Sequence, residues 1–489
     1  MMPIPGAFKM IFFPRVQLFV SICVFGLAVP GVATAYETAA DFNEADMNAV
    51  PSAAELAKLG VEGTEFTPSG AIRAGNAEGT IPEWKNEPVK PPAGWQPGTF
   101  HADPFAADKA VLTINAQNYK QYEDKLSAGH VKMFETYPDY VMNIYPTRRS
   151  AVFKPYIYKA AMENAGRARI VMSEVHPNLI GFQGAVIAWA FPIPKNGPQA
   201  FLNQATRPVT PWMENIENTT PVTSSGAYET VKLRIQQHWP WSLETNTIEN
   251  FDPQAAGLRY YQTTISPAKQ AGQVVLARDP VSFAKQFRQA WSYSPGQRRV
   301  KRAPQIVYDN PFTSADGLAT TDQKWGFNGP NDRFEYKLLG RKELYVPYNA
   351  YKLWAPGIDV KDMITSHGRL NQDLARYELH RVWVIEATLR EGTRHDYGKR
   401  TFYLDEDTWW IMLVDGYDRR NQLWRLWEEH DVMWYDQGFW ATVVGLQYDM
   451  QAGRMLLTNL DKGAPPDYSF RANPDAFFTP AQVRRDGVR

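Results

Sequence analysis

The residues best suited to acid–base or metal chemistry are eight histidines and two short carboxylate clusters. The histidines are scattered along the chain, and none forms an H-x-H or H-E-x-x-H pair, which are spacings that place two metal ligands together. The sequence also contains no Walker loop, no G-x-S-x-G and no G-x-G-x-x-G. We therefore predict no catalytic residue, no metal site and no cofactor.

Each of the two carboxylate clusters has a functional and a structural interpretation. Asp405 and Asp407 have D-x-D spacing, which is compatible with weak Ca²⁺ binding, but a solvated hairpin turn is the preferred interpretation. Residues 428–431 read Glu-Glu-His-Asp, yet neighbouring side chains of a strand point to opposite faces and cannot all converge. His380 follows Glu378 at strand spacing, which favours a hydrogen-bonded sheet residue over a general base.

Two arginine clusters are candidates for binding an anionic headgroup. Arg148 and Arg149 follow a Tyr-Pro-Thr turn, and Arg298 and Arg299 follow a Ser-Pro-Gly turn. Guanidinium groups bind phosphate and carboxylate in a bidentate manner, so we expect the four arginines to gather at one rim of a cavity. In that case, replacing Arg148 and Arg149 by Gln should leave stability nearly unchanged. The competing interpretation is ion pairing with the chain's own carboxylates.

The first 35 residues predict export. Lys9 and Arg15 precede an apolar stretch from 16 to 29, and an Ala-Thr-Ala cleavage pattern ends at Ala35. This order is typical of a secretory signal peptide. The single cysteine, Cys23, lies inside it, so the mature chain contains no disulfide and no catalytic thiol. We expect a soluble periplasmic protein, cleaved after Ala35.

The amino-acid composition limits the classes of molecule that the protein is expected to bind. Without Lys9 and Arg15 the chain has 50 basic residues against 52 acidic ones, a net charge of −2, which argues against nucleic-acid binding. Aromatic residues make up 13% of the chain and include 16 Trp. Large rings bury apolar surface and also line apolar ligand sites.

The elements that must position these residues are mainly strands. Helical spacing is predicted at 115–136, and Asp279-Pro280 is typical of the start of another helix. From 377 onward, alternating runs separated by turns every ten residues or so indicate an antiparallel meander. We predict a mainly β (α+β) fold: a large curved antiparallel sheet with helices on its concave side. The expected domains are the signal peptide (1–35), an irregular arm with short helices (36–138) and the sheet (139–489), including a helical plug and a long loop at 309–333.

An apolar cavity is expected where aromatic residues of this sheet meet. The parity of the predicted strands allows several of them to share one space, although it does not fix which face of the 409–414 strand is inward. The predicted cavity residues are Trp383, Ile385, Trp409, Trp410, Trp440 and Trp291.

Five stretches, taken together, carry a family resemblance. They are 66–84 (FTPSGAIRAGNAEGTIPEW), 145–151 (YPTRRSA), 191–197 (FPIPKNG), 291–300 (WSYSPGQRRV) and 377–384 (YELHRVWV). This ordered set resembles domain-of-unknown-function family thirteen-twenty-nine, a group of exported proteobacterial proteins. The family is similar in its sheet to the LolA/LolB lipoprotein carriers, which implies a half-open barrel. It also implies an RND-type exporter or an outer-membrane protein as a partner, but no catalytic residues.

We therefore predict a periplasmic binding or carrier protein for a lipid or another hydrophobic ligand, working with an envelope export system. One alternative is a lipid-modifying hydrolase with an unconventional site around His380, His430 and neighbouring carboxylates. Another is an accessory subunit of an exporter that has no ligand of its own.

Overall fold

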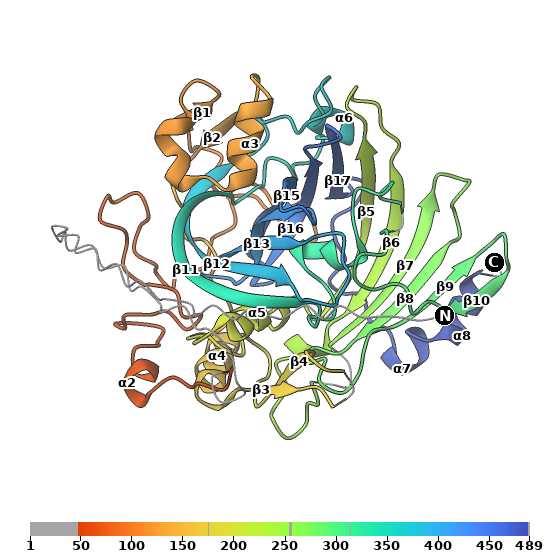
Figure 1. Ribbon diagram of the computed structural model, residues 1–489, viewed down its shortest axis with the longest axis horizontal. Coiled ribbons are helices and arrows are strands. Elements are labelled where there is room, and N and C mark those ends of the chain that lie inside the picture. The colour runs from red at the N-terminus through yellow and green to blue at the C-terminus, as the bar shows by residue number, and fades with distance from the viewer. Residues whose placement is uncertain (1–46, 175, 254–256, 313, 488–489) are drawn as a thin grey trace, which may run out of the picture. The chain divides into compact units, whose positions relative to one another are not determined.

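The computed structural model describes residues 47–174, 176–253, 257–312 and 314–487 (Figure 1). The predicted signal peptide, 1–35, lies outside these residues. The described residues belong to one structural unit, Ala39–Arg489, whose centre is a sheet of fifteen strands. Among the described residues, no helix is long and apolar enough to span a membrane.

The elements follow one another with strands dominating the C-terminal half. The first part contains α2 (Ala53–Leu56), β1 (Leu112–Asn115), η1 (Tyr119–Lys125), α3 (Ala128–Thr136), β2 (Val141–Ile144), α4 (Pro155–Arg167), β3 (Arg169–Met172), β4 (Ile180–Gln183) and α5 (Gly197–Ala205). The middle contains β5 (Trp212–Val222), β6 (Val231–His238), η2 (Pro240–Ser242), β7 (Leu258–Ser266), β8 (Val274–Asp279), β9 (Gln289–Ser294), β10 (Arg299–Arg302), η3 (Thr321–Gly326) and β11 (Phe334–Pro347). The last part contains α6 (Val360–Met363), β12 (Tyr377–Leu389), β13 (Lys399–Asp405), β14 (Ile411–Tyr417), β15 (Leu423–Trp434), β16 (Phe439–Asp449), β17 (Arg454–Leu460), α7 (Pro474–Phe477) and α8 (Pro480–Gly487).

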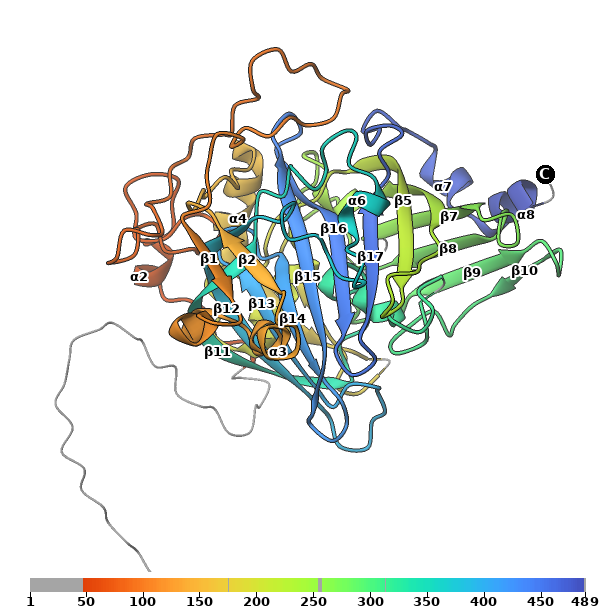
Figure 2. The ribbon, with the colours of Figure 1, turned by 90° about the horizontal axis from the view of Figure 1, so that it is seen from above.

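The sheet is open and almost entirely antiparallel. Its strand order is β1-β2-β12-β13-β14-β15-β16-β17-β5-β6-β7-β8-β9-β10, and β11 also pairs with β12, on the side opposite β2 and β13. Only the single pairing between β2 and β12 is parallel. Figures 1 and 2 show the sheet curling from β11 and β12 round to β9 and β10. The predicted curved antiparallel sheet and the meander from 377 onward are confirmed.

The two faces of the sheet are covered by different elements. The inner face carries α5, which packs against β11 and β12, and η3, which packs against β14 and β15. The outer face carries α3 on β14 and β15, and α8 on β8, β9 and β10. Because both faces of its central strands are covered, β12 is buried along almost its whole length, so its charged side chains need partners within the protein.

Two predicted helices differ from the structure. The segment 115–136 begins at the end of β1 and contains η1 and α3 rather than one helix. The helix expected from Asp279-Pro280 is wrong, because Asp279 ends β8 and the chain returns as β9. Arg288 donates to both carboxylate oxygens of Asp279, at 2.7 and 2.6 Å, and this buried pair closes the hairpin between the two strands.

Candidate functional site

A cavity lies on the inner face of β7, β8 and β9. Its volume is about 380 Å³, and residues of the loop that precedes β11 form its other wall. That volume is within the range of small-molecule sites, which are ~300–1,000 Å³. The apolar part of its lining is formed by Leu258, Tyr260, Val275, Ala277, Phe312 and Trp325.

Trp325 separates this cavity from three smaller neighbours. It lines the 380 Å³ cavity and also three spaces of about 50, 60 and 60 Å³. Its φ of 57° lies in the left-handed region, which is unfavourable for a bulky aromatic residue. Gly326 follows with φ of 79°, and a Cβ there would lie 2.6 Å from Ile411 of β14. This turn therefore holds the indole at the centre of the inner face.

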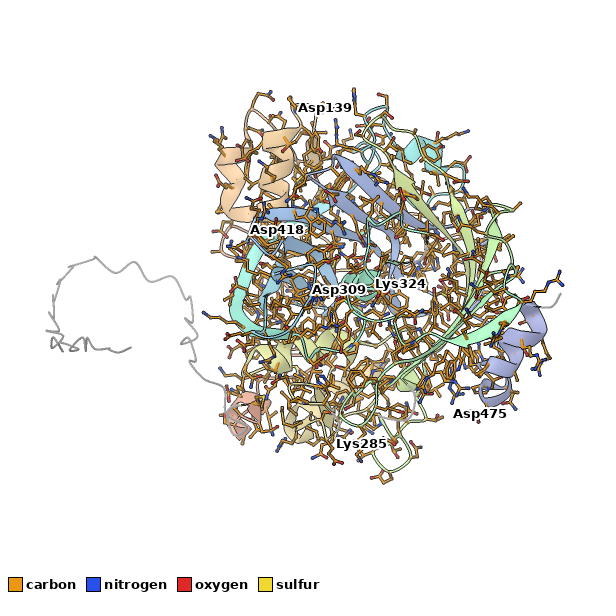
Figure 3. The ribbon with its side chains drawn as sticks, turned by 45° about the vertical axis from the view of Figure 1, so that its right-hand side comes forward. Asp139, Lys285, Asp309, Lys324, Asp418 and Asp475 are labelled. Carbon is orange, nitrogen blue, oxygen red and sulfur yellow. The ribbon has the colours of Figure 1, made fainter. Side chains whose placement is uncertain are left out.

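Ion pairs of Asp322 and Lys324, the two charged residues that precede Trp325, hold η3 against neighbouring parts of the sheet. The buried Asp322 accepts from Arg400 at 2.9 Å and is 3.1 Å from Nε2 of His395. Lys324 donates to Glu217 of β5, and its ammonium also lies 5.2 Å from the Trp325 ring centre. In Figure 3, Lys324 lies on the inner side of the sheet.

The inner face also carries three buried ionisable groups that belong to neither of these pairs. Arg207 follows α5, and Glu429 and Asp431 lie on β15. Burial lowers the pKa of Arg207 to about 10. Burial also raises the pKa of Glu429 well above its usual value, and raises that of Asp431 to about 6. A carboxyl group with a raised pKa is ionised to a smaller extent, so it neutralises less of the positive charge of a neighbouring guanidinium.

The structure distributes the predicted cavity residues over three environments. Trp410 and Trp440 line one of the spaces of about 60 Å³. Trp383 and Trp409 are stacked on each other with ring centroids 5.3 Å apart, and Ile385 belongs to the same buried cluster. Trp291 packs beside residues of α7 and α8 on the outer face, whereas the next residue, Ser292, lines the 380 Å³ cavity.

The four predicted headgroup arginines do not gather at one rim. Arg148 pairs with Asp108 at the surface, at 2.6 Å. The buried Arg149 donates to both oxygens of Asp407, at 2.9 and 2.7 Å. Arg298 and Arg299 lie at the β9–β10 hairpin, at the opposite end of the strand order from β2. Arg149 is therefore engaged by a carboxylate of the protein, in agreement with the ion-pair interpretation.

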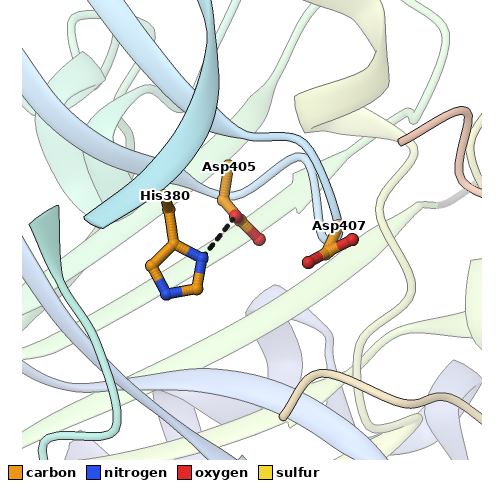
Figure 4. A group of neighbouring side chains, drawn as sticks. All are labelled: His380, Asp405 and Asp407. Atoms are coloured by element: carbon orange, nitrogen blue, oxygen red, sulfur yellow. Dashed lines mark ion pairs between the residues drawn. The ribbon is translucent and has the colours of Figure 1, made fainter. Parts of the chain in front are cut away.

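Sequence motifs did not indicate the group formed by His380, Asp405 and Asp407, which Figure 4 shows together. One ligand atom from each lies within 4.8 Å of the others, and all three residues are buried. The solvated turn expected at 405–407 is therefore wrong: Asp405 is 0% exposed and Asp407 is 3% exposed. Asp407 already accepts from Arg149, and burial raises the pKa of Asp405 well above its usual value, which disfavours the ionised form that a metal ion would need.

The second histidine cluster lies elsewhere and is equally sealed. His130 of α3 is 2.7 Å from Glu428, and His430 is 3.6 Å from the same carboxylate. Both histidines and Glu428 are 0% exposed. Neither this cluster nor His380 contributes to the lining of the central cavities. Among the described residues, the two histidines of the hydrolase alternative therefore do not face these cavities.

The residues that dominate the inner face were not singled out by the sequence. Lys324 and Trp325 fall inside the predicted loop 309–333, so that range was the available signal. Arg207 stands alone between Thr206 and Pro208, without a neighbouring basic residue. Only the folded structure shows that Arg207 lies beside the cavities.

Comparison with known proteins gives one close sequence relative and several distant structures. An uncharacterised protein of Pseudomonas aeruginosa is 39% identical over 446 residues, covering 90% of this chain and 95% of the relative. A lipoprotein-sorting protein domain from Vibrio parahaemolyticus aligns with a TM-score of 0.39 and 14% identity, over 59% of this chain and 98% of that one. A LolA-superfamily protein from Nitrosomonas europaea aligns with a TM-score of 0.36 and 12% identity, over 58% and 97%.

A third solved structure, from Desulfovibrio piger, belongs to the family named in the sequence analysis. It aligns with a TM-score of 0.36 and 13% identity, over 56% of this chain and 90% of that one. The model of the same family, described as a protein of unknown function (DUF1329), matches residues 113–484. This match spans most of the chain, which therefore belongs to the DUF1329 family.

Proposed function

We propose that the protein binds and carries a lipid or another hydrophobic ligand in the periplasm. The observation that carries this proposal is the cavity of about 380 Å³ on the inner face of an unclosed sheet. Rings and aliphatic side chains supply about half of its lining residues, and polar or charged side chains supply the rest. Such a lining stabilises a bound apolar chain by about 25 cal/mol for each Å² removed from water. The buried histidine clusters have no access to this space.

The test starts from protein purified from its native periplasm. Native mass spectrometry and organic extraction should reveal a hydrophobic molecule bound without a covalent bond. The stripped protein should then bind an added long-chain amphiphile. A protein that carries no ligand and binds no amphiphile would overturn the proposal and favour the ligand-free accessory subunit.

Two variants of one strand localise the site. Ser292 lines the 380 Å³ cavity, whereas Gln289 lies on the opposite face of β9 by strand alternation. Ser292→Trp should fill part of the cavity and weaken amphiphile binding at least tenfold, while Gln289→Trp should bind as the wild type does. Equal weakening in both variants would place the ligand elsewhere.

The compartment and the partner belong to the same proposal. Cleavage after Ala35 should give a mature protein that begins at Tyr36 and is released by osmotic shock. Recovery in the spheroplast pellet would contradict this location. The family resemblance points to an envelope export system as the partner, so crosslinking in intact cells should capture an exporter or outer-membrane component.

A further inference from the structure

Arg207 is a buried cation whose charge is not matched by an adjacent carboxylate. Its residue exposure is 7%, and its Nη1 donates to the backbone and side chain of Gln204. Its Nε is buried without a hydrogen-bond partner. Among the described residues, the other arginine that lines the central cavities, Arg288, pairs with Asp279, and the buried Arg400 pairs with Asp322 of η3. A buried charge without such a partner is costly, so a retained one indicates a use.

The surroundings of Arg207 leave space for a small group. The guanidinium lies 4.3 Å from the ring centre of Trp410, and it lines both spaces of about 60 Å³. Indole rings of Trp239, Trp325 and Trp440 form further walls of one of these spaces. Such a volume is suited to a headgroup rather than to a chain. Because Arg207 is buried, an ion pair formed with it is stronger than the same pair at the surface.

The space beside Arg207 adjoins the large apolar cavity. Leu258, Trp325 and Asn328 line both the 380 Å³ cavity and one of the two spaces next to Arg207. The cations that face the large cavity itself, Lys324 and Arg288, are held by Glu217 and Asp279. Among the described residues that line these spaces, Arg207 is consequently the cation without an ion pair.

We propose that Arg207 binds the anionic headgroup of a single-chain amphiphile whose apolar chain extends past Trp325 into the 380 Å³ cavity. The headgroup is a carboxylate or a phosphate monoester, since both match the two-pronged geometry of a guanidinium. The proposal rests on the proposed function and adds the ligand class and a specificity-determining residue. Nearby Glu429 and Asp431 oppose an anion when they are ionised, so their raised pKa values favour this role.

The experiment compares three probes with one chain length: palmitate, hexadecyl phosphate and hexadecanol. The stripped full-length protein is titrated with each, as wild type and as the Arg207→Gln variant. The wild type should bind at least one anionic probe about tenfold more tightly than hexadecanol. Arg207→Gln should remove this preference and leave hexadecanol binding unchanged. The anionic probe that binds more tightly distinguishes a carboxylate ligand from a phosphate one.

Two variants serve as controls. Arg298→Gln removes an exposed arginine at the β9–β10 hairpin and should behave as the wild type does. Arg207→Lys keeps the charge but not the bidentate geometry, and should retain part of the preference. If Arg207→Gln does not fold, ¹³C NMR of carboxyl-labelled palmitate bound to the wild type replaces it. The pKa of the bound carboxyl should then lie below that of labelled butyrate free in solution, because a nearby guanidinium favours the ionised form.

The possible failures are distinguishable. If hexadecanol and both anionic probes bind the wild type equally, the carrier function survives and the role of Arg207 is overturned. If Arg207→Gln weakens all three probes alike, the residue only supports the fold. A labelled carboxyl whose pKa lies above that of free butyrate overturns the headgroup contact as well. If no probe binds the wild type, the proposed function fails and this inference fails with it.

Discussion

Lys324 donates to both carboxylate oxygens of Glu217, at 2.7 and 2.9 Å, and so joins η3 to strand β5 across the inner face of the sheet. Both side chains are 12% exposed, and both contribute to the wall of the space of about 50 Å³. The ammonium also lies 5.9 Å from the ring centre of Phe312, which lines the large cavity. The pair thus holds one wall of the proposed ligand site in place.

Replacing Lys324 by Met should loosen this wall. The change leaves the Glu217 carboxylate without its cation in a mostly buried place, which should lower the free energy of unfolding by about 3 kcal/mol. Ligand association should become faster, because η3 loses one of its two attachments. Urea unfolding and stopped-flow binding measure the two effects. Lys232→Met is the control: Lys232 is 45% exposed and pairs with Asp461, so the loss should be below about 1 kcal/mol.

Arg149 should be required for stability, whereas its neighbour Arg148 should not. The side chain of Arg149 is 2% exposed, while that of Arg148 is 45% exposed. Arg149→Met strands the buried Asp407 carboxylate and should cost about 3–5 kcal/mol in urea unfolding. Arg148→Met should cost less than about 1 kcal/mol. The structure thereby replaces the sequence-based expectation that both arginines can be removed without loss of stability. Equal losses in the two variants would contradict the buried pairing.

The sheet could be predicted because strands follow from the local sequence pattern. The ionic contacts could not be predicted, because they join residues that are far apart in the sequence. Alternation along 377–389 and the turns that follow it indicate strands whatever their partners are. Arg149 and Asp407 are 258 residues apart, and no local pattern reveals that they meet. The failed helix after Asp279 has the same origin, since its capping signal was outweighed by the bidentate contact with Arg288. Arg207 was not predicted because the sequence does not show which arginines lack a carboxylate partner in the folded protein.

Substitutions of two tryptophans should have different effects on stability and on ligand affinity. Trp383 is 2% exposed and stacks on Trp409, so Trp383→Ala should cost about 3–5 kcal/mol of stability through the cavity that it leaves. Trp325 is only partly buried and sits in a strained backbone conformation, so Trp325→Ala should cost less. Its removal joins the four central spaces, and the affinity for amphiphiles should change. Unfolding curves and amphiphile titrations of both variants decide this. An unchanged affinity in Trp325→Ala would argue against a ligand beside η3.

Asp431 provides a pH-dependent test of the inner face. Burial raises its pKa from 3.8 to about 6, so the folded protein binds this proton more tightly than the unfolded chain does. Stability is therefore lost as pH rises from about 4 to about 6, and the loss is complete above that range. A rise of about two units corresponds to about 3 kcal/mol.

Asp431→Asn removes this titration and keeps an acceptor for the indole N–H of Trp440, which lies 3.0 Å from Asp431. The stability of the variant relative to the wild type should thus increase by about 3 kcal/mol between pH 4 and pH 7. Asp418→Asn is a control of opposite sign. Backbone N–H groups of Gln422 and Arg420 lower the pKa of Asp418, so this variant should lose relative stability as pH rises. Urea unfolding at pH 2, 3, 4, 5, 6 and 7 measures both differences, because the change for Asp418 lies below about pH 4. A pH-independent difference for Asp431→Asn would show that this carboxyl is not desolvated, and that the inner face is more hydrated than its packing indicates.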